Sequence, residues 1–292
     1  ELSAIGVSIT EANSTYLLFG LALILISLAF KVGAVPLHLW IPDVYQGSPT
    51  PTTSFLSIAS KASGFAISLR VLEPFLNNPV THDKTVAILS ILAGATILVG
   101  NLAAIPQTNF KRLLAYSSIA NAGFILLAVA AWDKGSDLTS AQVVGFYLAI
   151  YLIMTFAAFF ILSTIHRNTG SEEISAFEGL GTRNPFLALM TTIVMAAMAG
   201  VPLTAGFYGK FFAFEAAVQA DLWVPISIGF VGVAAGFYYY FQIIRAMYWR
   251  KSLDESPIKV RPLSLYVLIT LTSLLIIFGF FPQPILWLLQ AA

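Results

Sequence analysis

Long stretches without a charged residue alternate with short polar connections along the whole 292-residue chain. Six stretches lack Asp, Glu, Lys and Arg, namely 85–110, 113–132, 138–165, 184–209, 222–244 and 262–292. Each has at least the roughly 20 residues with which a helix crosses a hydrocarbon core. Two further apolar segments, 15–41 and 51–72, contain one lysine each. The pattern predicts about eight transmembrane helices, at about 15–35, 52–72, 84–104, 110–131, 140–165, 185–219, 222–249 and 262–282.

Composition strengthens this prediction of an all-α polytopic membrane protein. Hydrophobic residues make up 58% of the chain and charged residues 10%, against about 25% charged in soluble domains, which excludes an ordinary soluble enzyme. A net charge of +1 gives no electrostatic basis for binding nucleic acid. The absence of cysteine excludes Cys-ligated clusters and disulfides. The three histidines have no metal-ligand spacing, so we expect neither a cofactor nor a metal in this chain.

The basic residues outside the predicted spans are unevenly divided between the two sides of the membrane. The connections after the first, third, fifth and seventh spans hold nine, namely Lys111, Arg112, Arg167, Arg183, Arg245, Arg250, Lys251, Lys259 and Arg261. The connections on the other side hold Arg70, Lys84 and Lys134. Because basic connections stay in the cytoplasm, the first set is predicted to be cytoplasmic and both ends of this chain external.

Three lysines remain, and all lie inside apolar sequence. Lys61 is near the middle of its segment, Lys31 has apolar residues on both sides, and Lys210 follows a long uncharged run. A charge at the centre of a membrane helix costs about 2.5–3.5 kcal/mol on insertion scales, so we expect these side chains to face a hydrated interior. Burial disfavours the charged form of lysine, which suits a proton relay. The alternatives are hydrogen bonding between helices, or extension of the side chain to the membrane surface.

Helix-breaking residues accompany two of these lysines. The segment 185–220 would measure about 54 Å as one helix, too long for a membrane, and Gly200, Pro202, Gly206 and Gly209 predict its interruption. The first span has the same feature at Gly33 and Pro36, and the tripeptide Val-Pro-Leu occurs at both places. Interrupted helices at corresponding positions of two halves are typical of inverted-repeat transporters.

Other polar residues give weaker signals. Ser117, Ser118 and Asn121 share one face of a predicted helix, where they either order water between the lysines or bond a neighbouring helix. His38 is either a proton carrier or an interior histidine with its bonds satisfied. The proline-rich segment 41–52 is predicted to be an extended connector. Asp43 and Glu215 either pair with lysines or mark span ends in water, and we favour span ends. Tyr238–Tyr240 are interpreted as residues that pack and anchor the helix rather than bind a ligand.

Four runs of sequence resemble one family. FKVGAVPLHLWIPDVYQGSPTPTTSFLSIASKASGF at 30–65 resembles the antiporter-like N subunits of proton-pumping NADH:quinone oxidoreductase, respiratory complex I. The runs 111–124, 199–214 and 238–248 resemble the same family. The resemblance implies inverted five-helix repeats with broken helices and a mid-membrane chain of lysines and waters. Lys31, Lys61 and Lys210 match the family lysines of helices seven, eight and twelve.

The resemblance also implies an organisation for the chain. Residues 1–72 would end the first repeat, 84–249 would form the second repeat, and 262–292 would hold the C-terminal helix. The chain begins at Glu1 rather than Met, and we expect it to be the C-terminal portion of a longer protein that supplies the glutamate of the fifth helix. Where many relatives have His, this chain has Asn121, which can orient a proton path but cannot titrate.

By the same resemblance, the chain would be a non-redox subunit of a bacterial plasma-membrane translocase. Flavin, iron–sulfur clusters and quinone would belong to partner subunits, and other membrane subunits of complex I and lipid would be its neighbours. The alternatives are a subunit of a multisubunit Na⁺/H⁺ antiporter or of a membrane-bound hydrogenase, which share the fold. A structural subunit without transport is the third interpretation.

Overall fold

A computed structural model describes residues 14–132, 137–252 and 256–291 of the chain. Its elements in chain order are α2 (Ser14–Val32), α3 (Trp40–Gly47), α4 (Thr50–Phe55), the π-helical η1 (Leu56–Ser60), α5 (Lys61–Leu76), α6 (His82–Ala104), α7 (Phe110–Ala130), α8 (Ser140–Thr169), the 3-10 helix η2 (Ile174–Phe177), α9 (Leu180–Arg183), α10 (Pro185–Ala199), α11 (Ala205–Gln219), α12 (Trp223–Trp249), α13 (Pro262–Phe280) and α14 (Gln283–Gln290). The prediction of a helical protein is confirmed for the described residues.

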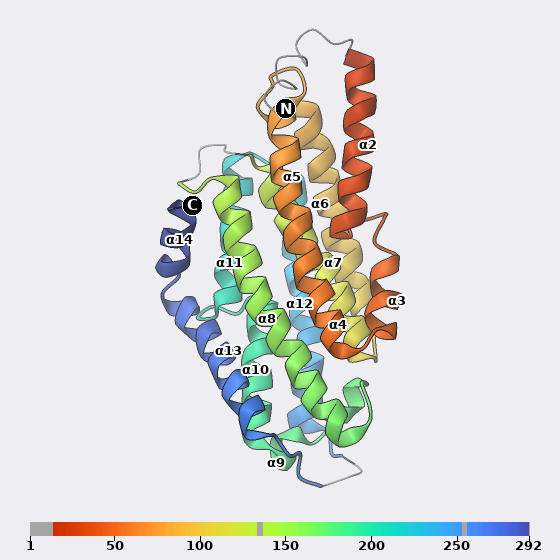
Figure 1. Cartoon of the computed structure of the whole chain (residues 1–292), viewed down its shortest axis with the longest axis vertical. Coiled ribbons are helices and arrows are strands. Elements are labelled where there is room, and N and C mark those ends of the chain that lie inside the picture. The colour runs from red at the N-terminus through yellow and green to blue at the C-terminus, as the bar shows by residue number, and fades with distance from the viewer. Residues whose placement is uncertain (1–13, 133–136, 253–255, 292) are drawn as a thin grey trace.

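The long helices run up and down, roughly along the longest axis of the molecule (Figure 1). Within the part of the chain that the structure describes, six helical segments are long and apolar enough to cross a membrane, namely Thr50–Leu76, His82–Ala104, Phe110–Ala130, Ser140–Thr169, Trp223–Trp249 and Pro262–Phe280. Two apolar helical segments are shorter, Tyr16–Val32 and Pro185–Ala199. The structure therefore has a polytopic arrangement of helices.

Helix α7 forms the centre of the bundle. All of its residues except Arg112 and Tyr116 are buried, and it packs against α3, α6, α8 and α11. Glycine permits the closest approach, because a Cβ added at Gly123 would lie 2.7 Å from the backbone nitrogen of Ile97 on α6. Polar side chains on α7 are therefore surrounded by protein.

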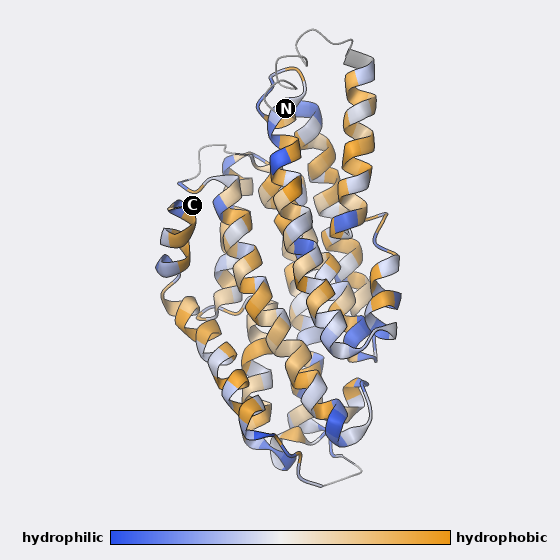
Figure 2. Cartoon of the chain, viewed as in Figure 1, coloured by the Kyte–Doolittle hydropathy of each residue, from blue (hydrophilic) through white to orange (hydrophobic). Residues whose placement is uncertain are grey.

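The outside of the bundle is apolar along the lengths of the helices. Large hydrophobic side chains are exposed there, including Ile91, Phe230, Val231, Leu263 and Ile277. Hydrophilic residues gather at the connections and at the ends of the molecule (Figure 2). Soluble monomers rarely expose apolar surface on this scale, whereas helices in contact with lipid require it.

The prediction of an extended connector at 41–52 is wrong. Helix α3 covers Trp40–Gly47, and α4 begins at Thr50 with Pro51 in its first turn. Proline is accepted there because the first N–H groups of a helix have no intrahelical partner. Ile41, Pro42 and Tyr45 of α3 are buried, so one face of this short helix packs against the bundle.

Candidate functional site

Two of the predicted membrane spans are interrupted by a glycine at which a helix ends. Helix α2 ends at Val32 and is followed by Gly33 with φ +75°, and α10 ends at Ala199 and is followed by Gly200 with φ +87°. Left-handed backbone of this kind favours glycine. Pro36 and Pro202 lie just beyond these glycines, whereas Gly206 is the second residue of α11.

Neighbouring elements support both interruptions. After the first, the backbone N–H of Val35 donates to Oγ1 of Thr96 on α6, at 3.0 Å. After the second, Gly279 of α13 lies so close that an added Cβ would meet the backbone at Leu203 and Thr204. Irregular backbone at membrane depth requires such partners, because lipid offers no hydrogen bonds.

Lys61 is buried at the end of the first interrupted helix. Its side chain is 2% exposed, and its Nζ donates to the carbonyl oxygen of Val32 at 2.9 Å. Lys61 directly follows the π-helical turn η1, a local geometry that frequently marks functional sites. The carboxyl end of a helix carries partial negative charge, and the amine of Lys61 donates its hydrogen bond to this end of α2.

Lys210 has an equivalent environment at the second interruption. It is 9% exposed, and its Nζ donates to the carbonyl oxygens of Met198 at 3.0 Å and Ala199 at 2.8 Å. These are the last two residues of α10. Its Nζ also lies 5.5 Å from the ring centroid of Phe124 on α7. Both buried lysines are thus held by the carboxyl end of an interrupted helix.

The other residues predicted for the site have different surroundings. Lys31 is exposed on the surface of the described residues, not enclosed with Lys61. Successive side chains of an α-helix point in directions about 100° apart. Val32 points into the bundle and is buried, so the neighbouring Lys31 points outward. His38 is 8% exposed, and its Nδ1 has no hydrogen-bond partner among the described residues. It is therefore an interior histidine whose bonds are not all satisfied.

The polar face of α7 bonds neighbouring helices through tyrosine hydroxyls. Ser118 Oγ lies 3.3 Å from the hydroxyl of Tyr45 on α3, and Ser117 bonds the hydroxyl of Tyr240 on α12. Tyr147 of α8 donates to Oδ1 of Asn121 at 2.8 Å. These five residues and Asn121 are all buried. The structure therefore favours bonding between helices over isolated water-ordering groups at this face.

These bonds form two groups along α7, the pair Tyr45–Ser118 and the set Ser117, Tyr240, Asn121 and Tyr147, in which Asn121 Nδ2 lies 3.4 Å from Ser117 Oγ. Tyr45 belongs to α3, which follows the Gly33 interruption. At the other end, the ring of Tyr147 lies 3.4 Å from a Cβ added at Gly209, the residue before Lys210. The tyrosine partners were missed by sequence reasoning, although a tyrosine in an apolar helix indicates a hydroxyl that needs a partner when buried.

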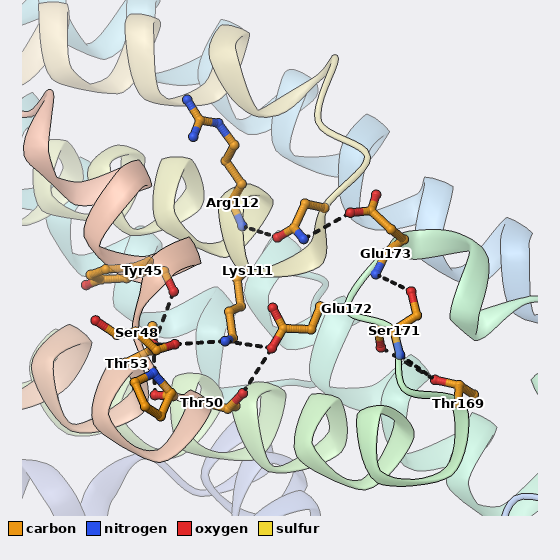
Figure 3. A network of polar contacts seen from close by, with 12 residues as sticks. Tyr45, Ser48, Thr50, Thr53, Lys111, Arg112, Thr169, Ser171, Glu172 and Glu173 are labelled. Carbon is orange, nitrogen blue, oxygen red and sulfur yellow. Dashed lines mark hydrogen bonds and ion pairs between the residues drawn. The ribbon is translucent and has the colours of Figure 1, made fainter.

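A third buried lysine, Lys111, was also missed by the sequence analysis. Lys111, assigned from the sequence to a basic connection, is 3% exposed. Its Nζ lies 2.6 Å from Oε1 of Glu172 and donates to the carbonyl of Ser48 at 2.9 Å (Figure 3). The hydroxyl of Thr50 donates to the same carboxylate at 3.4 Å. This cluster joins the connection between α3 and α4 to the polypeptide between α8 and η2.

No group of three or more potential metal ligands among His, Cys, Asp and Glu occurs in the described ranges. An apolar helical bundle with two interrupted helices and buried lysines at their carboxyl ends defines a polytopic integral membrane protein.

Comparison with known proteins gives the family. Residues 2–236 match the model described as "NADH:quinone oxidoreductase/Mrp antiporter, TM", and the chain belongs to this transmembrane family. It is 40% identical over 285 residues to NADH-quinone oxidoreductase subunit N 1 of Roseiflexus castenholzii, covering 94% of this chain and 52% of the relative. It is 41% identical over 290 residues to NADH-quinone oxidoreductase subunit N of Dehalococcoides mccartyi, covering 98% of this chain and 59% of the relative. The chain thus spans little more than half the length of these relatives.

Solved structures agree in fold. A chain of respiratory complex I from Thermus thermophilus with bound aureothin is 37% identical, with a TM-score of 0.76 over 91% of this chain and 57% of that one. A chain of an archaeal membrane-bound sulfane sulfur reductase is 30% identical, with a TM-score of 0.89 over 99% of this chain and 58% of that one. Both similar proteins are parts of respiratory membrane complexes.

Proposed function

We propose that this chain is part of a proton-translocating subunit of a complex I-type NADH:quinone oxidoreductase. Lys61 and Lys210 would each bind and release a proton, and quinone reduction elsewhere in the complex would drive the transfer. The observation that carries the proposal is the position of both lysines, each buried and bonded to the carboxyl end of an interrupted helix. The curated relatives at 40–41% identity support the quinone-reducing branch.

The path between the lysines would use the hydroxyls around α7. A hydroxyl both donates and accepts hydrogen bonds, so Tyr45, Ser118, Ser117 and Tyr240 can pass a proton. Asn121 would hold Tyr147 in place without titrating. Lys31 and His38 would serve the same path near the first interruption.

The membrane arrangement belongs to the same proposal. Helix α2 and the interrupted pair α10–α11 would cross the membrane together with the six longer segments, giving eight crossings. Residues 1–72 would end one inverted repeat, 84–249 would form the next, and 262–292 would add the C-terminal helix. The basic connections would face the cytoplasm of a bacterial plasma membrane.

The partners and cofactors follow from the proposed complex. Other antiporter-like and small hydrophobic membrane subunits would contact this chain within the lipid bilayer. Flavin, iron–sulfur clusters and quinone would be bound by partner subunits, and this chain would be non-redox. Purification of the native complex under mild conditions, followed by flavin and iron assays, tests this part. Purified partners without redox cofactors would instead favour a Na⁺/H⁺ antiporter.

The relay is tested by Lys61→Met in the assembled complex in membrane vesicles. Methionine keeps the length and packing of the side chain but removes the titrating amine. We expect normal assembly and quinone reduction with fewer protons translocated per electron. Lys259→Met is the matched control, because Lys259 is exposed in the connection before α13. A wild-type proton-to-electron ratio in Lys61→Met would favour the structural interpretation of the lysine.

A further inference from the structure

An open cleft lies beside Lys210, between α11 and α12. Its volume is about 470 Å³. The residues that line it are Gly200, Phe207, Lys210, Phe211, Phe214, Glu215, Val218, Gln219, Phe230 and Val233. Most of this wall is apolar, and Lys210 and Glu215 are its two ionisable members. The cleft therefore gives the buried lysine a route to the outside of the bundle that is separate from the α7 network.

Lys210 retains a hydrogen that the helix end does not use. An ammonium group has three N–H donors, and the bonds to Met198 and Ala199 account for two of them. Those carbonyls hold the charge but cannot accept the proton itself. A proton that leaves Lys210 through the cleft therefore needs another acceptor.

Glu215 is placed to be that acceptor. It lies five residues after Lys210 on α11, which at 1.5 Å per residue is about 7.5 Å further along the helix axis. Its side chain is half-buried, and none of the ion pairs or hydrogen bonds found among the described residues involves it. Gln219 lies one turn beyond and lines the same cleft. Lys210, Glu215 and Gln219 thus line the cleft in order along α11 toward its carboxyl end.

This direction leads away from the basic end of the molecule. Helix α11 ends at Gln219, and α12 returns from Trp223, so this connection lies at the opposite end from α9, as Figure 1 shows. By the distribution of basic residues, that end is the external one. A carboxylate in this position meets a proton that is leaving the membrane.

We propose that Glu215 is the proton-release residue of this chain, a proposal that rests on the proposed role of Lys210. The N–H bond of the Lys210 ammonium breaks, water in the cleft carries the proton, and an O–H bond forms on the Glu215 carboxylate. Lysine becomes a neutral amine and glutamate a neutral acid. Glu215 then gives the proton to external water, and Lys210 is reprotonated from the interior path.

The test compares Glu215→Gln with Asp221→Asn in the full complex in membrane vesicles. Asp221 is an exposed carboxylate at the same end of the molecule but outside the cleft, so it is the matched control. We expect Glu215→Gln to slow proton transfer through this subunit by about 100-fold, the lower end of what a positioned acid or base contributes. The proton-to-electron ratio should fall, Asp221→Asn should be unchanged, and Glu215→Asp should restore part of the loss.

Lys210→Met separates this proposal from the proposed function. If Lys210→Met lowers the ratio and Glu215→Gln does not, the release role is wrong while the relay stands. If neither variant changes the ratio, the relay itself is wrong.

A second measurement requires no variant. Dicyclohexylcarbodiimide is apolar and reacts with protonated carboxyl groups, so it should label Glu215 in the wild-type complex and lower pumping, with Asp221 unlabelled. Peptide mass spectrometry reads both sites. Absence of label on Glu215 while pumping is active would contradict a carboxylate that takes up protons in an apolar cleft.

Discussion

Single glycines permit the geometry in which the buried lysines are bound. Gly33 and Gly200 both have left-handed backbone at the carboxyl end of a helix. A Cβ added at Gly33 would lie 4.0 Å from Nζ of Lys61, and one added at Gly200 would lie 3.4 Å from Nζ of Lys210. The absence of a side chain therefore leaves room for the amine as well as permitting the turn.

Replacing Gly200 with alanine tests this residue. Left-handed backbone costs a non-glycine residue about 1–2 kcal/mol, and the new methyl group would lie 3.0 Å from Cδ of Lys210. We expect Gly200→Ala to lower the free energy of unfolding by at least that amount, measured by thermal unfolding in detergent. Gly20→Ala is the control, because nothing lies within 4 Å of a Cβ there and helical alanine is favoured over glycine. Equal stability of both variants would contradict this account.

At the residue scale, the sequence was informative where the signal was local. A lysine in an apolar run and a Gly-Pro pair near mid-span identified Lys61, Lys210 and both interruptions without a structure. The exposure of Lys31 could not be predicted, because it depends on the rotation of α2 about its own axis. The tyrosine partners of Ser117 and Asn121 come from helices that are distant in the sequence. They could not be predicted from the sequence of one helix alone.

At the scale of elements, each interruption depends on a helix from elsewhere in the chain. Thr96 of α6 accepts from Val35 at the first, and α13 packs on the backbone of the second at Gly279. The connection at 41–52 shows the limit of prediction at this scale. Its prolines indicated extended backbone, but Pro51 occupies a first helical turn, and the number of prolines alone does not distinguish these cases.

Thr96→Val tests the support of the first interruption. Valine has nearly the same shape but leaves the partly buried N–H of Val35 without this acceptor, which costs up to about 1–3 kcal/mol. We expect a corresponding loss of thermal stability. Thr191→Val is the matched control, since Thr191 is fully buried and its hydroxyl donates only to Leu187 of its own helix. If both variants lose the same stability, the bond to Val35 contributes nothing specific.

At the scale of the whole molecule, the Lys111–Glu172 pair joins parts that are far apart in the sequence. It fixes the α3–α4 connection to the segment before η2, near the basic end of the bundle. The basic residues near span ends predict that this end faces the cytoplasm. The distribution of basic residues could not show that Lys111 is buried, because a lysine in a connection is also what the cytoplasmic side of a membrane protein usually has.

Glu172→Gln tests the contribution of the Lys111–Glu172 ion pair to stability. Removing one partner of a buried ion pair leaves a buried charge unpaired, which costs about 3–5 kcal/mol for fully buried pairs. Because the Glu172 side chain is 20% exposed, we expect a loss near the lower end, about 3 kcal/mol, in the free energy of unfolding. Glu178→Gln, which breaks the more exposed pair with Arg250, should cost at most about 1 kcal/mol. A smaller loss of unfolding free energy for Glu172→Gln than for Glu178→Gln would show that the Lys111–Glu172 pair does not stabilise the fold.

The enclosure of α7 bears on how the bilayer can influence this protein. Acyl chains reach α13 and the outer faces of α2 and α12, but the hydroxyls and amide of α7 lie behind a complete layer of protein. Changes in lipid thickness, fluidity or headgroup therefore press on the outer helices while the interior keeps its own dielectric environment. The outer helices thus separate the buried polar groups of α7 from the bilayer, so a change of lipid acts on these groups only through the packing of the surrounding helices.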